Sequence, residues 1–370
     1  MPGVLGCGGR FLPGRPVALP DVDVEKVLLA SPRGFCAGVE MAIKSLAWMT
    51  RVFEPPVYCY HEIVHNKVVV DRFREMGVVF VEDVAEVPEG APMMLSAHGS
   101  PPEIVEAAKA RGGAVVNAVC PLVKKVHHEV KVRSGKGYSI VYVGHEGHQE
   151  AIGTAAVAPD AVHRVERLEE LEGLAQFEGP VAFLAQTTLA VDEWEALLEA
   201  ARRRWPDLWV PGTSDLCFAT TNRQKALKNI AGECDVVVVI GSENSSNTRA
   251  LERTAVAAGC QRVLRVNGPE ELPGDLAGTV GVIAGASAPE EVVSAVIAAL
   301  GPRDGVEEIS AIDEDEYFPL PRELRDSVRN LAAAAAVAGL SPGADPTAGG
   351  APLPDDREMS AAMALAGLTH

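Results

Sequence analysis

The hydrophobic positions of the chain alternate between two patterns. Short apolar runs end in polar or glycine-containing turns, and each turn leads into a stretch in which apolar residues recur every three or four positions. The runs predict strands at 27–30, 57–60, 93–96, 114–116, 140–143, 181–185, 236–240 and 280–284. The stretches predict helices at 67–76, 104–111, 191–204, 249–258 and 290–300. This alternation is typical of an α/β fold with mainly parallel sheets.

Three stretches share a more specific plan, in which a strand is followed by a loop with one cysteine and then by an amphipathic helix. Their cysteines are Cys36, Cys120 and Cys217, about one in each third of the chain. This repetition predicts three similar α/β lobes. The strand and helix units also permit a single eight-stranded barrel, which is the rival architecture.

Each of these cysteines lies at or just before a predicted helix N-terminus. Unpaired N–H groups and the helix dipole favour an anion there, so we expect a thiolate to form easily. Packing as a small apolar residue is the alternative for any one of them. Together, the three could bind zinc with a histidine, or three irons of a [4Fe-4S] cluster. Zinc sites usually use closely spaced cysteine pairs, which the sequence lacks, and a cluster with three thiolates keeps one iron open to a substrate oxygen.

Polar and titratable residues follow the predicted strands. In open parallel sheets ligands bind beyond the carboxyl ends of the strands, so these turns are the candidate site. The residues are His65, His98, His148, Thr187, Thr188, Ser245, Ser246, Asn247 and Ser287. Helix-start N–H groups and imidazolium groups suit phosphate oxygens, although serine, threonine and asparagine are also ordinary helix caps. No G-x-x-x-x-G-K-S/T motif and no convincing G-x-G-x-x-G after a strand occur, so a phosphorylated substrate is favoured over a nucleotide cofactor.

Glu150 is the carboxyl most suited to deliver a proton inside such a pocket, because it follows His148 by two residues. From position alone it is equally typical of a first-turn glutamate that the helix dipole favours. A structural and a catalytic role therefore both stay open.

Composition narrows the class of protein. At 370 residues the chain exceeds a typical single domain, and its formal net charge of −18 argues against general binding of nucleic acid. Seven cysteines without close pairs indicate a reducing compartment. No run reaches the apolar length of a membrane span, and glycines and prolines interrupt residues 1–20 where a signal peptide would be apolar. We therefore expect a soluble cytoplasmic protein that binds neither nucleic acid nor membrane.

The pattern changes at both ends of the chain. We expect an N-terminal extension over 1–25 and an acidic arm over 301–325 that docks on the body. Residues 326–370 are rich in alanine, glycine and proline, and we expect them to be disordered apart from one short helix at 331–338.

Eight longer motifs occur in order between about residues 26 and 325. They are PRGFCAGV at 32–39, HEIVHN at 61–66, SAHG at 96–99, CPLV at 120–123, QTTL at 186–189, CFATTNRQ at 217–224, NSSN at 244–247 and GASAP at 285–289. Together they resemble the 4-hydroxy-3-methylbut-2-enyl diphosphate reductases, the family that catalyses the last step of the non-mevalonate isoprenoid pathway.

The resemblance implies three α/β lobes in pseudo-threefold arrangement around a central [4Fe-4S] cluster, with ligands matching Cys36, Cys120 and Cys217. The expected divisions are a first strand and cluster loop that pack with the third lobe, followed by the three lobes, at 26–37, 38–118, 119–214 and 215–300. In this family the allylic hydroxyl of the substrate binds the open iron. Two electrons and protons remove it as water, giving isopentenyl and dimethylallyl diphosphates.

The resemblance also implies roles for the candidate residues. The residue matching Glu150 relays protons, and the one matching Thr187 lies beside the hydroxyl. Those that hold the diphosphate match His65, His98, His148, Ser245, Ser246, Asn247 and Ser287, and we add Thr188 to the substrate-binding set. Electrons come from ferredoxin or flavodoxin, and the basic residues at 124, 125, 131, 133 and 136 are candidates for meeting such an acidic carrier.

Three positions depart from the family's usual pattern. Val119 replaces a threonine, Gln149 a proline and Ser100 an apolar residue, but none of these changes removes a candidate ligand or the acid. Two other functions stay open: a non-catalytic iron–sulfur or zinc-binding regulator on the same scaffold, and a metal-free phosphosugar enzyme on a barrel. Glu150 together with Thr187 favours the reductase, because a regulator needs the cysteines but not the acid.

Overall fold

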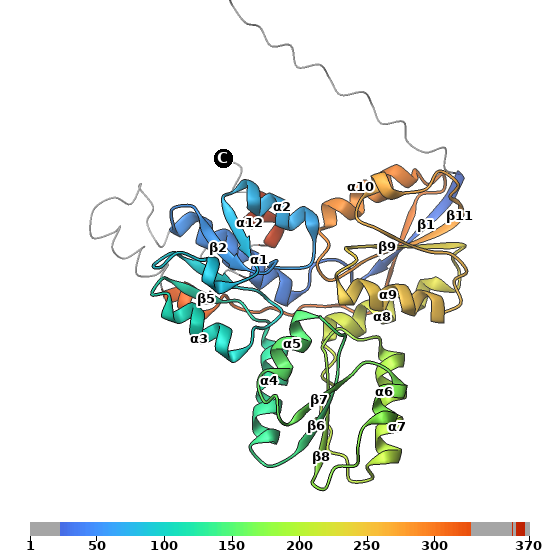
Figure 1. The fold of residues 1–370 in the computed structure, drawn as a ribbon. Coiled ribbons are helices and arrows are strands. Elements are labelled where there is room, and N and C mark those ends of the chain that lie inside the picture. Colours follow the sequence, from blue (N-terminus) through green and yellow to red (C-terminus); the bar gives the residue numbers. More distant parts are fainter. Residues whose placement is uncertain (1–22, 327–356, 358–359, 367–370) are drawn as a thin grey trace, which may run out of the picture.

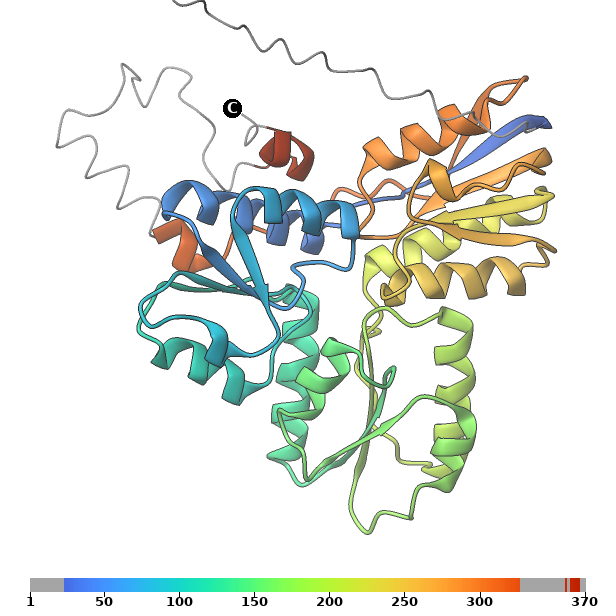
Figure 2. The ribbon, with the colours of Figure 1, turned by 45° about the horizontal axis from the view of Figure 1, so that its top comes forward.

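The structure is a computed structural model that describes residues 23–326, 357 and 360–366. Its strands form three sheets in which all neighbouring strands are parallel. Each sheet with its helices forms one lobe, and the three lobes meet around a common centre (Figures 1 and 2). The prediction of three α/β lobes is confirmed, and the separate sheets exclude the eight-stranded barrel.

Lobe 1 contains the sheet with strand order β3-β2-β4-β5. Its strands are β2 (Val57–Tyr60), β3 (Val78–Val81), β4 (Met93–Leu95) and β5 (Val115–Asn117), and its helices are α1 (Ala37–Val52), α2 (Lys67–Glu75) and α3 (Pro102–Ala110). This sheet has an apolar core on each of its two faces, and side chains of successive strand residues point alternately into one core and the other. Met94 packs in the core that contains α1 and α2, whereas Met93 and Leu95 pack on the α3 side.

Lobe 2 contains the smallest sheet, with strand order β7-β6-β8. Its strands are β6 (Ser139–Val143), β7 (Val162–Val165) and β8 (Val181–Ala185), and its helices are α4 (Pro121–Ser134), α5 (Gln149–Ala155), α6 (Leu168–Gly173) and α7 (Val191–Arg204). Val141 and Phe183 face the core on the α7 side, and Tyr142 and Leu184 face the core that contains α4. Both faces are covered, which explains why the central strands read as continuous apolar runs.

Lobe 3 contains the sheet with strand order β10-β9-β11-β1-β12. Its strands are β1 (Asp23–Ser31), β9 (Val236–Ile240), β10 (Val263–Val266), β11 (Ala277–Ala284) and β12 (Val306–Ser310), and its helices are α8 (Phe218–Ala231), α9 (Ser246–Ala257) and α10 (Glu290–Leu300). Although β1 precedes all of lobe 1 in the chain, it lies inside this sheet. Leu29 packs in the core that contains α10, and Leu28 packs in the core that contains α8 and α9.

The chain after α10 differs from expectation in two places. Residues 306–310 form β12 at the sheet edge, so the expected arm at 301–325 begins with a strand. Residues 361–366 form helix α12 (Ala361–Ala366), which contacts α1 and buries Leu365 in the core of lobe 1. The expectation of disorder over 326–370 is therefore wrong for this helix. The expected helix at 331–338 and residues 1–22 lie outside the described residues.

The loops that follow the strands converge where the lobes meet. β1 leads directly into the loop of Cys36, β5 into the loop of Cys120, and the segment after α7 into Cys217. Parallel strands place their carboxyl ends on one edge of each sheet, which brings these loops to a shared centre. Within the part of the chain that the structure describes, no helix has both the length and the apolar character needed to cross a bilayer.

Candidate active site

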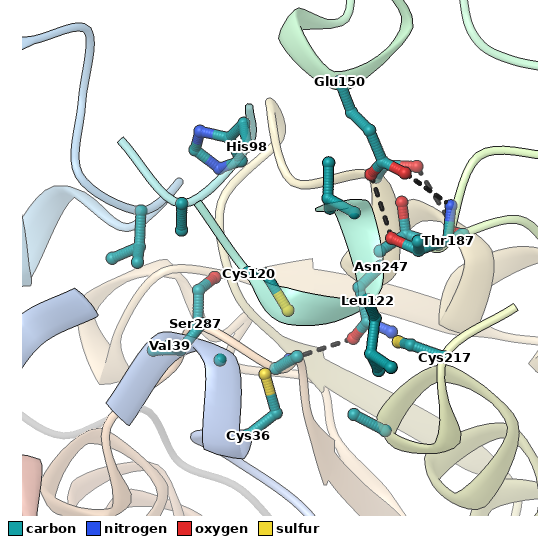
Figure 3. Close-up of a pocket in the computed structure, with 18 of the residues that line it drawn as sticks. Cys36, Val39, His98, Cys120, Leu122, Glu150, Thr187, Cys217, Asn247 and Ser287 are labelled. Carbon is teal, nitrogen blue, oxygen red and sulfur yellow. Dashed lines mark hydrogen bonds between the residues drawn. The ribbon is translucent and has the colours of Figure 1, made fainter. Parts of the chain in front are cut away.

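A cavity lies at this centre (Figure 3). Its wall contains every site residue that the sequence analysis selected: Cys36, Cys120, Cys217, His65, His98, His148, Glu150, Thr187, Thr188, Ser245, Ser246, Asn247 and Ser287. The structure thus brings together residues from all three lobes.

The three cysteines enter the cavity as the N-cap residues of α1, α4 and α8. The first turn of α1 passes close to two of the sulfurs because Gly38 has no side chain. A Cβ at Gly38 would lie 2.8 Å from Cys120 Sγ and 3.9 Å from Cys36 Sγ. On α8, Thr220 N–H donates to Cys217 Sγ at 3.3 Å, and Thr220 Oγ1 lies 3.0 Å from the same sulfur.

Burial controls the charge of these thiols. It raises the pKa of Cys36 and Cys120, and it raises the pKa of Cys217 to about 12. Backbone N–H groups of the helix starts lower each pKa but do not offset burial. Our expectation of easily formed thiolates is therefore wrong for the free thiols, because desolvation outweighs the helix dipole. Bound cations would reverse this balance, since a coordinating thiol is deprotonated.

The arrangement fits a polynuclear cluster better than a single ion. Among the described residues, no three histidine, cysteine, aspartate or glutamate side chains are grouped so that they could hold one metal ion. Three sulfurs spread around one cavity suit a cluster in which each thiolate binds a different iron. The apolar side chains of Leu122, Val123 and Phe318 line the same cavity and limit access of solvent.

Three histidines from lobes 1 and 2 form one part of the wall. His65 stacks on His98 with ring centroids 3.9 Å apart, and His148 meets them edge-on at 5.4 and 6.0 Å. Burial, together with the neighbouring histidines, lowers the pKa of His98 and lowers that of His148 to about 3. His148 Nδ1 accepts a hydrogen bond from Glu150 N–H at 3.1 Å, which leaves its proton on Nε2.

Some of the polar atoms in this wall lack a partner. His65 Nε2 and His98 Nδ1 are buried without a hydrogen bond among the described residues, whereas His65 Nδ1 lies 3.6 Å from Glu62 Oε2. Buried polar atoms are normally hydrogen-bonded, so these nitrogens indicate a polar ligand. The N–H group of such an imidazole can donate a hydrogen bond to an anion, and a bound anion favours the charged form of the ring.

The first turn of α9 supplies small polar groups beside the histidines. Ser245 caps this helix by accepting a hydrogen bond from Thr248 N–H at 3.3 Å. Asn247 Oδ1 accepts from Ala286 N–H at 2.9 Å, and Ser287 Oγ donates to the His65 carbonyl at 2.9 Å. The first two bonds fix Ser245 and Asn247 at the N-terminus of α9, where N–H groups and the dipole attract phosphate, and Ser287 joins them from the loop between β11 and α10.

Glu150 is a buried carboxyl at the start of α5, with 3% of its surface exposed. Its Oε1 accepts a hydrogen bond from Thr187 N–H at 2.7 Å, and its Oε2 accepts from Thr187 Oγ1 at 2.9 Å (Figure 3). Burial raises the pKa of Glu150 to about 7, although both bonds from Thr187 favour the carboxylate. A carboxyl with this pKa can hold and release a proton near neutrality.

Two residues without a sequence-based role also belong to this region. Phe318, from the segment after β12, lines the cavity and lies 6.2 Å from the ring of Phe218. Arg223 is buried and contacts the backbone of the Cys36 loop. The CFATTNRQ motif, which contains Arg223, could have indicated a role for this arginine. No local sequence pattern indicates a role for Phe318, because only the fold of the chain brings it to the cavity.

Parallel α/β lobes around a cavity with three cysteines, three histidines and a buried carboxyl define a three-lobed α/β oxidoreductase. More particularly, the chain belongs to the LytB protein family, whose model matches residues 27–301. It is 46% identical over 315 residues to 4-hydroxy-3-methylbut-2-enyl diphosphate reductase of Rhodopirellula baltica, covering 84% of this chain and 98% of that protein. It is 44% identical over 309 residues to the Mycobacterium leprae enzyme of the same name, covering 82% and 93%.

Solved structures agree with this assignment. The E-1-hydroxy-2-methyl-but-2-enyl-4-diphosphate reductase of Plasmodium falciparum matches with a TM-score of 0.80 at 30% identity, covering 84% of this chain and 99% of that one. A second structure, of (E)-4-hydroxy-3-methyl-but-2-enyl diphosphate reductase, matches with a TM-score of 0.55 at 31% identity, covering 75% and 99%. The family resemblance that the motifs predicted is confirmed.

Proposed function

We propose that this chain reduces (E)-4-hydroxy-3-methylbut-2-enyl diphosphate to isopentenyl and dimethylallyl diphosphates, with a [4Fe-4S] cluster held by Cys36, Cys120 and Cys217. The observation that carries the proposal is the buried Glu150–Thr187 pair in the same cavity as the three cysteines. A non-catalytic iron–sulfur protein would need the cysteines, but it would gain nothing from a buried carboxyl that titrates near neutrality.

The cluster would supply electrons and one iron that accepts the substrate hydroxyl as a Lewis base. The protein residues orient the rest of the substrate. The buried nitrogens of His65 and His98 and the Nε2–H of His148 can donate to diphosphate oxygens. The α9 N-terminus, with Ser245, Ser246 and Asn247, supplies further donors and a favourable dipole, and Ser287 and Thr188 complete the polar wall.

Glu150 would manage the protons. The reaction replaces a C–O bond with a C–H bond: two electrons and two protons enter, one proton leaves with the hydroxyl as water, and the other joins the allylic carbon. Glu150 can hold such a proton because burial raises its pKa to about 7. Its two hydrogen bonds to Thr187 keep the carboxyl oriented, so the Thr187 hydroxyl can lie between Glu150 and the leaving oxygen.

Ferredoxin or flavodoxin is the proposed electron donor, and the exposed lysines of α4, which begins at the Cys120 loop, are the candidate surface for such an acidic protein. The proposed location is the cytoplasm. In support, the six cysteines within the described residues are all free thiols.

The first experiment is anaerobic reconstitution of the full chain with iron and sulfide, followed by iron and sulfide assays and electron paramagnetic resonance of the reduced protein. We expect a cluster signal that changes when the hydroxylated diphosphate is added, together with both isoprenoid products when electrons are supplied. Cys120→Ser should lose the cluster, whereas the matched change Cys234→Ser, outside the cavity, should keep it. Failure of the wild-type chain to hold any cluster would refute the proposal.

A further inference from the structure

Arg223 of α8 is the largest of the fully buried side chains in the described structure, and only 1% of its surface is exposed. Its Nε and Nη2 donate to the Gly34 carbonyl at 3.1 and 2.8 Å, and Nη2 also donates to the Phe35 carbonyl at 3.3 Å. Its Nη1 donates to the Ala219 carbonyl at 3.1 Å and to the Glu314 carboxylate at 3.0 Å. A guanidinium with this many partners holds one fixed orientation.

These bonds join the loop of Cys36 to α8, the helix that begins directly after Cys217, and both cysteines are candidate cluster ligands. Gly34 and Phe35 directly precede Cys36, and Arg223 stands on the helix that Cys217 caps. The carboxylate partner, Glu314, comes from the segment that follows β12. That carboxylate also accepts a hydrogen bond from the Asn222 side chain at 2.8 Å, so it too is held in place.

The two charges of this ion pair affect the cavity unequally. The Arg223 guanidinium donates directly to the carbonyls of the two residues that precede Cys36, whereas the Glu314 carboxylate bonds to Arg223 and Asn222 of α8. The Glu314 side chain is 10% exposed, compared with 1% for Arg223. The pair therefore presents a net positive potential to the Cys36 sulfur, because the guanidinium is the inner member.

We propose that Arg223 is a positioning residue that holds the Cys36 loop against α8 and, with Glu314 as a partly compensating charge, sets the reduction potential of the cluster. This inference rests on the proposed function, since it concerns a cluster on Cys36 and Cys217. One-electron reduction by an external donor adds one negative charge to the cluster. A buried positive charge stabilises the reduced state and a buried negative charge opposes it, because hydrogen bonding, net charge and burial set the potential of such clusters.

The test is a dithionite titration of the anaerobically reconstituted full chain, with the midpoint potential read by electron paramagnetic resonance. Arg223→Gln should shift the midpoint to more negative values, and Glu314→Gln should shift it to more positive values. The double variant removes both charges and should fall between the two, on the negative side of wild type. Lys228→Gln is the matched control, because it removes a positive charge from an exposed position on the same helix, and it should leave the midpoint unchanged.

Arg223→Lys separates charge from geometry. Lysine keeps the positive charge but cannot form the forked contact with the Gly34 and Phe35 carbonyls. We expect a midpoint close to wild type and faster loss of iron to a chelator, since the loop of Cys36 is held less firmly.

The outcomes distinguish the competing explanations. Shifts of the same sign in Arg223→Gln and Glu314→Gln would mean that both only loosen the structure, and would overturn the inference. An equal shift in Lys228→Gln would also overturn it. If Arg223→Gln fails to fold, Glu314→Gln still decides the matter, because it keeps the guanidinium and its bonds to the Cys36 loop, and the absence of a positive shift would contradict a charge effect. Absence of a cluster in the wild-type chain would instead refute the proposed function.

Discussion

The raised pKa of Glu150 predicts a measurable dependence of stability on pH. Its ordinary value is 4.5, and burial raises it to about 7. The ionised carboxyl is therefore less favourable in the folded than in the unfolded chain by about 3 kcal/mol, since each pKa unit corresponds to about 1.4 kcal/mol. Glu150→Gln keeps the shape and can still bond to Thr187, but it cannot ionise.

The sign follows from proton binding. Between about pH 4.5 and 7 the folded chain keeps a proton that the unfolded chain has lost, so the contribution of Glu150 to stability falls as pH rises through this window and is constant above it. The glutamine variant lacks this loss. The stability of Glu150→Gln minus that of wild type should therefore increase by about 3 kcal/mol between pH 4.5 and 8.

Urea unfolding of the metal-free chain, under reductant and without oxygen, measures this difference. Urea titrations of both proteins are carried out at the two pH values. The slopes of the free energy of unfolding against urea concentration are compared to check that unfolding exposes the same surface. Glu75→Gln, on the exposed side of α2, is the matched control for changing a glutamate in contact with water. A difference between Glu150→Gln and wild type that does not change with pH would show that Glu150 ionises normally and would refute the reasoning.

Four further predictions concern turnover, cluster binding and the C-terminal helix. The kcat of the wild type should fall about tenfold per pH unit above 7, because the protonated form of Glu150 becomes scarce. Glu150→Gln should retain cluster and KM but lose most turnover, and full turnover would contradict the proton assignment. Gly38→Ala should reduce the iron bound per chain, because the new Cβ would lie 2.8 Å from a candidate cysteine sulfur; Gly173→Ala, with nothing within 4 Å, should not. Leu365→Ala should lower the free energy of unfolding by about 2 kcal/mol, as expected for a buried leucine, whereas Met363→Ala, which is 59% exposed, should leave it unchanged.

The strands β8 and β9 were predictable because both of their faces are buried. β8 and β9 are buried at every position and read as unbroken apolar runs. The edge strands β7 and β10 each carry an arginine and bury only one of their four residues fully, so their sequences lack this pattern. β12 has two glutamates and no fully buried residue, and only its pairing with β1 makes it a strand.

The location of the candidate site could be predicted from the sequence, whereas the charge state of its side chains could be derived only from the folded structure. Polar residues after parallel strands could be assigned to one site because those strand ends converge. The charge of the thiols could not be derived in this way, because it depends on how much water the assembled lobes exclude around Cys217. Helix α12 was not predicted for a related reason. Its alanines favour a helix, but a helix this short is stable only when it packs on another element, here α1.

The place of β1 between β11 and β12 has a consequence for how the chain is made. Val27 pairs with Val280 on one side and with Val306 on the other. Among the described strands, β1 is therefore synthesised first, and its two neighbours are synthesised only after nearly the whole body. Lobes 1 and 2 can form their own sheets during that time, since all their strands lie between β1 and β9. Contacts of such long sequence separation slow folding, so closure of the lobe 3 sheet around β1 is expected to be the late step.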